Sequence, residues 1–468
     1  FRSVAARAYP TMESFFDSEK AVIRHRQVVL GGLFDFPDIH VLRLSVYKAL
    51  TGERLTEVQL KPTDRVSRLQ QAVATAAQVG LLQVSLLFGS RLLLDGLATL
   101  ASVGLCDGAD VGAVVIAPGR LVLTSSADGT ARLWSTQDGE CVQVFEGHEY
   151  HVTSAQFSPD GGSVVTASLD GVAAVWQLGD ARCTGVLDGQ DYQVLSASFS
   201  PDGQHIITAP LDQTAKIWSA KDASLIATLH GHSDVVLAAQ FAPDGLTAVT
   251  RAADGTAKVW SIPAGECLQT MVCGRGEPRL AAFSPNGRLL LTAGTDLTAS
   301  LWQRGDRPGD AFRLAKTFKG FDAEVSCGVF SPDGTLVAVG CLAGSIQIFK
   351  SELGELGVEE RKVLGRHTGR VNAVAFCHAP LGGGQELFVA SAGADATARL
   401  WRLSDLTCTG VLEGHEAEVH SVSCSPDGTV VLTASSDGTA RIWQIEDGAL
   451  LHTLKGHGGG VLSASFSP

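Results

Sequence analysis

The phrases SADGTARLW at residues 126–134 and SSDGTARIW at residues 435–443 decide the fold, because the chain repeats them along most of its length. All seven tryptophans occupy the last place of this phrase. The first five, from Trp134 to Trp302, follow one another at intervals of 42 residues, and so do Trp401 and Trp443. The 99-residue gap between Trp302 and Trp401 holds one more copy, SIQIFK, in which Phe349 takes the place of the tryptophan. The chain therefore contains eight units.

Each unit consists of short apolar runs separated by turns rich in Gly, Asp and Pro. In the second unit, VTSAQF leads through SPDG to SVVTAS, and Asp170-Gly171 then leads to AAVW and CTGVL. This pattern predicts a four-stranded antiparallel sheet. Because a lone four-stranded sheet leaves its faces exposed, we expect successive sheets to stack around an axis.

The repeats resemble the WD-repeat family. The resemblance rests on the two phrases above and on Gly-His pairs at 147–148, 231–232, 414–415 and 456–457, and it covers about residues 119–468. It implies a β-propeller, which we assign to residues 117–468 in a mainly β chain, with eight blades preferred and seven possible.

The resemblance also implies a buried structural set in each unit. A His before the first strand, an Asp in the second turn and a Trp on the third strand should form one hydrogen-bonded group. The complete sets are His148, Asp170 and Trp176; His232, Asp254 and Trp260; His367, Asp395 and Trp401; and His415, Asp437 and Trp443. Gln190 and Gly274 replace the His in two units, and Phe321, Ala343 and Phe349 replace all three residues in the sixth. Since a catalytic triad is needed once and this group recurs, we interpret it as scaffolding.

The two ends of the repeat region complement each other. The first unit has Asp128 and Trp134 but no aligned Gly-His, whereas Gly456-His457 is followed by one strand only. We predict that residues 461–467 complete the blade that begins at Leu121, with His457 facing Asp128. The alternative is a sequence truncated within a repeat, with different ring boundaries, because both ends look trimmed.

Residues 40–116 follow another order, with two strands, a helix introduced by PTD, and further strands at QVSLLFGSRLL and ADVGAVVI. The helix presents Val66, Leu69, Val73 and Ala77 on one face. The order resembles ubiquitin-like domains, a small α+β fold. A ubiquitin-type binding patch would then comprise Leu50, Leu87 and Val114, although apolar strand residues are usually core. The strand at 111–116 also resembles the first strand of a blade, and we assign it to the ubiquitin-like sheet.

Residues 1–39 are expected to be a partly disordered segment, either a transit peptide or a leader ahead of Met12.

Departures from the repeat length point to interaction sites. The fifth and sixth units gain residues between their third and fourth strands, and the seventh gains CHAPLGGGQE between its first and second. These connections share one face, where insertions often mark a binding surface. The candidate contact residues are Arg304, Asp306, Arg307, Asp310, Glu352, Glu355, Glu359 and Glu360. Solvated loops without a partner are the alternative.

The opposite face offers a second candidate site. Residues just before the first strands line it: Glu277, Glu324, Arg370 and Glu418 on consecutive blades, with His151 and Gln193 further round. A mostly acidic arc could receive a basic peptide, or it could simply keep the ring in solution.

Composition limits the function classes. A formal net charge of -13 makes general nucleic-acid binding unlikely, and there is no 18-residue apolar run to span a membrane. Ten cysteines form no Cys-x-x-Cys pair, and Cys141, Cys183, Cys267 and Cys408 recur at one place, which predicts a buried packing position rather than a metal site or a disulfide framework. Reduced thiols suit the cytoplasm or the nucleus.

We therefore expect a non-catalytic scaffold that binds proteins or peptides through its propeller faces and a ubiquitin-like module. It should need no cofactor, metal or small-molecule substrate, because the chain shows no phosphate loop, metal-ligand spacing or isolated nucleophile motif. Two alternatives remain: a substrate receptor or adaptor of the ubiquitin–proteasome pathway, and an assembly factor for cilia or dynein cargo.

Overall fold

The computed structural model of the 468-residue chain describes sixteen stretches of sequence. They are residues 42–48, 54–64, 68–69, 71–73, 84–88, 91–92, 100, 105, 109–115, 121–179, 181–190, 192–273, 276–305, 310–351, 361–381 and 384–468. The chain divides into two compact units, Phe1–Ala77 with Val84–Val115, and Gln78–Gln83 with Ile116–Pro468. The domain limits predicted above, including that of the segment 1–39, remain predictions.

The first unit is built on a five-stranded mixed sheet. Its strands are β1 (Leu42–Lys48), β2 (Arg54–Leu60), β3 (Val84–Phe88), β4 (Arg91–Leu92) and β5 (Asp110–Val115), in the order β2-β1-β5-β3-β4. The last strand, β5, pairs in parallel with β1 and antiparallel with β3. The strand whose place was ambiguous in the sequence therefore belongs to this sheet and not to a blade.

A short helical stretch covers residues 68–69 and 71–73 of this unit. Asp64 precedes it and accepts a hydrogen bond from the Lys61 N–H at 2.7 Å, while Leu69 and Val73 are fully buried. Of the predicted apolar face, Val66 and Ala77 lie outside the described residues. The ubiquitin-like identity of the unit stays a prediction.

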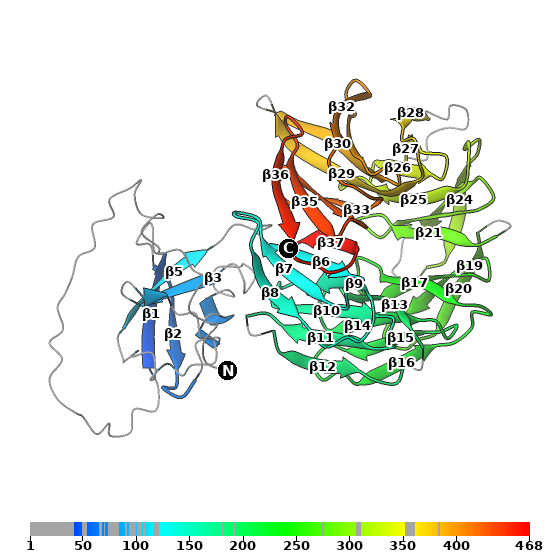
Figure 1. Cartoon of the computed structure of the whole chain (residues 1–468). Helices are drawn as coiled ribbons and strands as arrows, with labels where there is room; N and C mark the ends of the chain where they lie inside the picture. Colours follow the sequence, from blue (N-terminus) through cyan, green and yellow to red (C-terminus); the bar gives the residue numbers. More distant parts are fainter. Residues whose placement is uncertain are drawn as a thin grey trace, which may run out of the picture. The chain divides into compact units, whose positions relative to one another are not determined.

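The second unit is an eight-bladed propeller, as the repeats predict (Figure 1). Each blade is a four-stranded antiparallel sheet, and we number the blades as the units of the sequence. The strands of blades 1 to 4 are β37 (Val461–Phe466), β6 (Leu121–Ser126), β7 (Ala131–Ser135) and β8 (Cys141–Phe145); β9 (Val152–Phe157), β10 (Ser163–Ser168), β11 (Ala173–Gln177) and β12 (Cys183–Leu187); β13 (Val194–Phe199), β14 (His205–Pro210), β15 (Ala215–Ser219) and β16 (Leu225–Leu229); β17 (Val236–Phe241), β18 (Thr247–Ala252), β19 (Thr256–Ser261) and β20 (Cys267–Val272).

Blades 5 to 8 repeat this order. Their strands are β21 (Pro278–Phe283), β22 (Leu289–Gly294), β23 (Ala299–Arg304) and β24 (Phe312–Phe318); β25 (Val325–Phe330), β26 (Leu336–Cys341), β27 (Ser345–Lys350) and β28 (Lys362–Arg366); β29 (Val371–Leu381), β30 (Gly384–Gly393), β31 (Ala398–Arg402) and β32 (Thr407–Leu412); β33 (Val419–Cys424), β34 (Val430–Ser435), β35 (Thr439–Gln444) and β36 (Leu450–Lys455).

The predicted closure of the ring is confirmed. Strand β37, at the end of the chain, pairs antiparallel with β6, so that Val461 lies opposite Ser126 and Phe466 opposite Val122. His457 then lies 2.9 Å from the carboxylate of Asp128. The first blade is thus assembled from both ends of the propeller, which removes a free inner edge.

The hydrophobic core lies between blades rather than within them. Leu133 and Phe145 of blade 1, for example, pack with Val164 and Trp176 of blade 2 in one buried cluster. Turns at the strand ends depend on glycine where the backbone enters the left-handed region. Gly438, with φ of 82°, follows Asp437 in the turn between β34 and β35 and allows this tight reversal.

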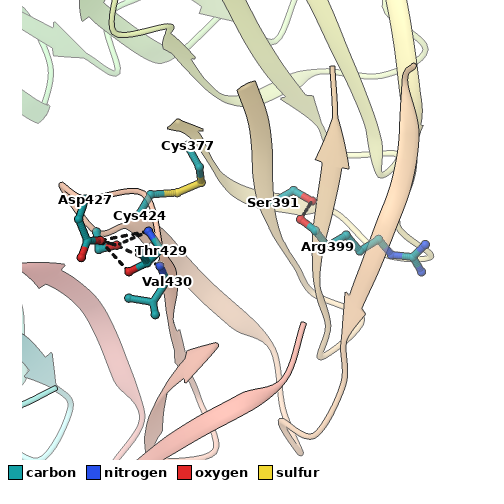
Figure 2. The surroundings of a disulfide bond; sticks show 8 residues. Cys377, Ser391, Arg399, Cys424, Asp427, Thr429 and Val430 are labelled. Atoms are coloured by element: carbon teal, nitrogen blue, oxygen red, sulfur yellow. Dashed lines mark hydrogen bonds between the residues drawn. A yellow bond between two sulfur atoms is a disulfide. The ribbon is translucent and has the colours of Figure 1, made fainter. Parts of the chain in front are cut away.

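A disulfide between Cys377 and Cys424 links blades 7 and 8 (Figure 2). Cys377 lies in the long hairpin β29–β30, whose backbone extends over the first turn of blade 8. There the carbonyl of His378 lies against Gly428, where any side chain would collide with it. Asp427 holds the same turn by accepting bonds from Ser425 and Thr429. The lengthening of the seventh unit is therefore an extended hairpin fixed to its neighbour.

Candidate functional site: the buried networks and the two faces of the ring

A threonine hydroxyl joins the predicted His, Asp and Trp of blade 8 into one chain of hydrogen bonds. The Trp443 indole N–H donates to Oγ1 of Thr433 at 2.9 Å. The same oxygen lies 2.8 Å from Nε2 of His415, whose Nδ1 lies 2.7 Å from Asp437. A neutral imidazole with its proton on Nδ1 satisfies every member, because it accepts from the threonine and donates to the carboxylate.

The same four-membered network occurs in five blades, including the one closed by the chain end. Its hydroxyl members are Thr124, Thr166, Thr250, Ser391 and Thr433. The five histidine side chains are at most 3% exposed. The hydroxyl residue was not predicted from the sequence, although its constant place ten residues before each Trp could have shown it.

Burial and hydrogen bonding fix the charges of the network. Desolvation lowers the pKa of His232, His367, His415 and His457, and outweighs the opposing effect of the Asp carboxylates. Although burial opposes ionisation, bonds from Thr439 and His415 lower the pKa of Asp437 to about 2. The network therefore holds a neutral His beside an ionised Asp, which suits a structural connector.

In blade 3, which lacks the histidine, a lysine pairs with the network aspartate instead. The Lys216 ammonium lies 3.0 Å from Asp212 and donates to the Gly189 carbonyl at 2.8 Å. Gln190, which stands where the His would be, donates instead to the Leu187 carbonyl. The Trp218–Thr208 bond is kept at 2.9 Å. In blade 5 the Trp302–Thr292 bond also remains, and Gly274 lies outside the described residues.

Blade 6 replaces the whole network by apolar groups. Phe321 and Phe349 stand for the His and the Trp, and their ring centroids are 5.6 Å apart. Val339 takes the place of the hydroxyl residue and lies in the same buried cluster. No polar member is left without its partners, because all four have changed together.

The face that carries the loops before the first strands, here the Gly-His face, holds the predicted acidic arc. Glu277 is exposed and, within the described ranges, forms no ion pair. Glu324 and Glu418 are half-buried and pair with arginines of adjacent blades, Arg279 at 3.2 Å and Arg370 at 2.5 Å. The acidic charge of the arc is thus partly neutralised within the ring.

Two tyrosines extend the Gly-His face over blades 2 and 3. Tyr150 is 61% exposed and Tyr192 is 56% exposed, and each directly precedes a predicted face residue, His151 or Gln193. These tyrosines were not predicted as contact residues, although they occupy equivalent places in two consecutive units of the sequence. Exposed tyrosines are typical of protein interfaces.

The opposite face, here the insertion face, carries the predicted insertions. Its candidate residue Arg304 is turned inward: its side chain is 7% exposed and its guanidinium lies 2.6 Å from Asp244 of blade 4. Asp310 is half-buried. The other candidates, Asp306, Arg307, Glu352, Glu355, Glu359 and Glu360, lie outside the described residues.

The recurrent cysteines correct one prediction. Cys141, Cys183, Cys267 and Cys408 are exposed, not buried. Each begins or nearly begins an outermost strand, where only one side of the strand is covered by the blade. Elsewhere in the propeller the Cys377–Cys424 disulfide shows that not every thiol is reduced.

The side chains of the predicted ubiquitin-type patch are not among those that the structure describes. Leu50 lies outside it, and Leu87 and Val114 belong to β3 and β5 without described side chains. Over the described ranges, no group of three or more His, Cys, Asp or Glu side chains could hold a metal ion. In that same part of the chain, no helix has the length and apolarity needed to cross a membrane.

Comparisons with known proteins agree with the repeat architecture. The family model described as IFT122 first beta-propeller matches residues 193–468, and the model described as WD domain, G-beta repeat matches residues 106–135 and 139–177. The chain is 52% identical over 42 residues to WD repeat-containing protein 86 of Homo sapiens, covering 9% of this chain and 11% of that protein. It is 32% identical over 94 residues to Protein TPR3 of Oryza sativa subsp. japonica, covering 20% of this chain and 8% of that protein. These matches span about a tenth of either relative.

A solved structure shares the fold. The crystal structure of the computationally designed Ika8 protein superposes with a TM-score of 0.57 at 24% sequence identity, covering 68% of this chain and 90% of that one. At this identity the likeness speaks for the architecture alone.

Proposed function

The chain belongs to the IFT122 first beta-propeller family, and from this premise we propose that it is a non-catalytic scaffold for protein contacts with a cilia-related role. WD-repeat propellers are typical interaction scaffolds, and the match over residues 193–468 is the observation that carries the proposal. The buried networks support a non-catalytic role, because their His, Asp and hydroxyl groups are hydrogen-bonded to one another and join strands.

We place the main docking surface on the Gly-His face. Tyr150 and Tyr192 supply exposed aromatic contact area on adjacent blades, and Glu277 supplies an acidic group. Aromatic anchors on the same face as a charge that fixes register are what a peptide-binding surface requires. A basic segment of a partner fits this arrangement, while the Arg279–Glu324 and Arg370–Glu418 pairs hold the loops in place.

The test compares partners of the full chain in ciliated and unciliated cells by proximity labelling. We expect enrichment of ciliary proteins in ciliated cells, reduced at least about fivefold in a Tyr150→Ala, Tyr192→Ala, Glu277→Gln variant, since truncating interface anchors costs more than 1 kcal/mol each. A matched variant on the insertion face, Asp244→Asn with Arg304→Gln, should retain its partners if it stays folded. Equal labelling in both cell types would refute the ciliary role, and retention of all partners by the first variant would refute the face.

Three further features of the chain remain predictions. A cytoplasmic location, a contact role for the insertion face and a ubiquitin-like module all need independent tests. Recovery of proteasome or ubiquitin-ligase subunits in the same labelling experiment would favour the adaptor alternative instead.

A further inference from the structure

The outermost strands of blades 5 and 6 carry lysines at one equivalent place. Lys316 of β24 lies opposite Leu301, and Lys362 of β28 lies opposite the equivalent Ile348. The other six blades place Gln143, Gly185, Ala227, Gln269, Gly410 and His452 there. The cationic residues are therefore confined to two neighbouring blades.

In two of the other blades, the side chain at this place contacts the next blade. In blade 4, the Gln269 side chain donates to the Phe312 carbonyl of β24 and accepts from its N–H, both at 2.6 Å. In blade 1, Gln143 accepts from Gly179 of blade 2 at 3.2 Å. By register, Lys316 and Lys362 occupy the equivalent places of blades 5 and 6, and the Lys316 ammonium lies 5.0 Å from the centroid of the Phe318 ring on its own strand.

The same two strands concentrate further positive charge. β24 also contains Arg313 and β28 also contains Arg366, whereas the other six outer strands together contain one lysine or arginine, Lys455. In the described part of the chain, neither Lys316 nor Lys362 forms an ion pair. This concentration contrasts with a formal net charge of -13 for the whole chain.

The two strands are neighbours on the rim of the ring and are open to an added segment. Arg361, just before β28, donates to the Gly320 carbonyl at 2.5 Å, and Arg366 pairs with Asp322, so β28 contacts the loop that follows β24. Each strand is the last of its sheet, and Leu314 and Val363 on them are 55% and 53% exposed (Figure 1). Such an edge leaves unpaired backbone groups beside apolar side chains.

Protection against edge-to-edge aggregation is a common reason for lysines on edge strands. That explanation would place charges around the whole ring, because all eight outer strands present the same kind of edge. The restriction to blades 5 and 6 points instead to a local requirement for positive charge.

We propose that β24 and β28 form a docking surface for an acidic, extended segment of a partner protein. Carboxylates of the segment pair with Lys316 and Lys362, and its apolar side chains cover Leu314 and Val363. The surface is separate from the Gly-His face, so its test is independent of the proposed function.

The experiment uses the full chain and a fluorescein-labelled peptide of twelve residues in which glutamate alternates with valine or threonine. Fluorescence anisotropy should show binding that weakens with added salt. Lys316→Gln with Lys362→Gln, which installs the residue of blades 1 and 4, should weaken binding at least about tenfold, whereas Lys455→Gln should change it less than twofold. Thermal unfolding of each variant verifies its fold.

Several outcomes would overturn the proposal. Equal binding by the wild type and the double variant, or an equal loss in Lys455→Gln, would remove the site. Stronger, lysine-dependent binding of duplex DNA would identify a phosphate surface instead. Binding of the peptide only after Glu352, Glu355, Glu359 and Glu360 are changed to glutamine would show that the chain's own segment occupies these strands. A glutamine-for-glutamate peptide that binds as well would show that charge is not the determinant.

Discussion

Blades 6 and 8 each consist of four antiparallel strands in the same order. Blade 8 joins its strands by a buried hydrogen-bonded network, whereas blade 6 has apolar packing at the same places. Blade 8 joins Trp443, Thr433, His415 and Asp437 by hydrogen bonds of 2.7 to 2.9 Å. Blade 6 fills the same places with Phe349, Val339, Phe321 and Ala343, and the first three lie in one buried cluster. Among these eight residues, no buried side-chain polar atom lacks a hydrogen-bond partner, which is the condition that a core must meet.

Because all four residues differ together between the two blades, we infer that the network acts as a unit. A hydroxyl in the middle of blade 8 is valuable only because an indole donates to it and an imidazole accepts from it. A valine in blade 6 is suitable only because its neighbours are aromatic. We therefore expect a single substitution in either blade to lower the free energy of unfolding more than its share of a coordinated substitution of all four residues.

The largest expected effect is the loss of Trp443. Trp443→Ala should lower the free energy of unfolding by about 3–5 kcal/mol, because it opens a cavity and leaves the Thr433 hydroxyl without its donor. Phe349→Ala opens the cavity without orphaning a polar group and should cost less. Urea unfolding followed by fluorescence of the other tryptophans measures both. An equal or larger loss in Phe349→Ala would contradict the role given to the hydrogen bonds.

The second effect concerns the disulfide that links blade 8 to blade 7. Cys377→Ser with Cys424→Ser should cost about 2–4 kcal/mol, since the disulfide closes a loop with a sequence separation of 47 residues. Cys141→Ser, at an exposed and unpaired cysteine, should stay within about 0.5 kcal/mol of the wild type. If adding a reductant leaves the unfolding midpoint of the wild type unchanged, the bond does not form in solution.

Exchange of the central residue gives the third and sharpest test. Thr433→Val in blade 8 and Val339→Thr in blade 6 should each cost about 1–3 kcal/mol, because each leaves a buried polar group unsatisfied. Changing blade 8 fully, with Thr433→Val, His415→Phe, Asp437→Ala and Trp443→Phe, should cost less than the sum of its single changes. Simple additivity would show that the four residues do not act as a unit.

Repeat spacing predicted the propeller, its eight blades and its closure, because a fixed 42-residue period and one unmatched half-unit leave few alternatives. The resemblance to WD repeats also indicated which His, Asp and Trp residues belong together. The hydroxyl residue was missed because it lies among the apolar residues of a strand, although its constant place ten residues before each Trp marks it. The inward turn of Arg304 and the exposure of Cys141 were not predictable either, since each depends on how a strand lies against the neighbouring blade.

The smallest expected effect is a pH dependence that blade 8 has and blade 6 lacks. Burial lowers the pKa of His415 below its ordinary value of 6.5, so the unfolded chain binds more protons than the folded one in the interval below that value. The contribution of the histidine is therefore complete above pH 6.5 and is lost as the pH falls. Asp437, with its pKa lowered from 3.8 to about 2, adds a second loss only below pH 3.8.

The measurement is the free energy of unfolding at pH 7.5 and pH 5.5, where the histidines act and the aspartates do not. We expect lower stability at pH 5.5. The fully exchanged blade 8 should show a smaller difference than the wild type, since it has lost one of the four network histidines whose pKa is lowered. The Phe349→Ala variant of blade 6 should keep the full difference, because no titrating group of the network is present there. A pH difference that is the same in the exchanged blade 8 would mean that His415 carries the same charge in the folded and unfolded chain, and the neutral imidazole assigned to the network would then be wrong.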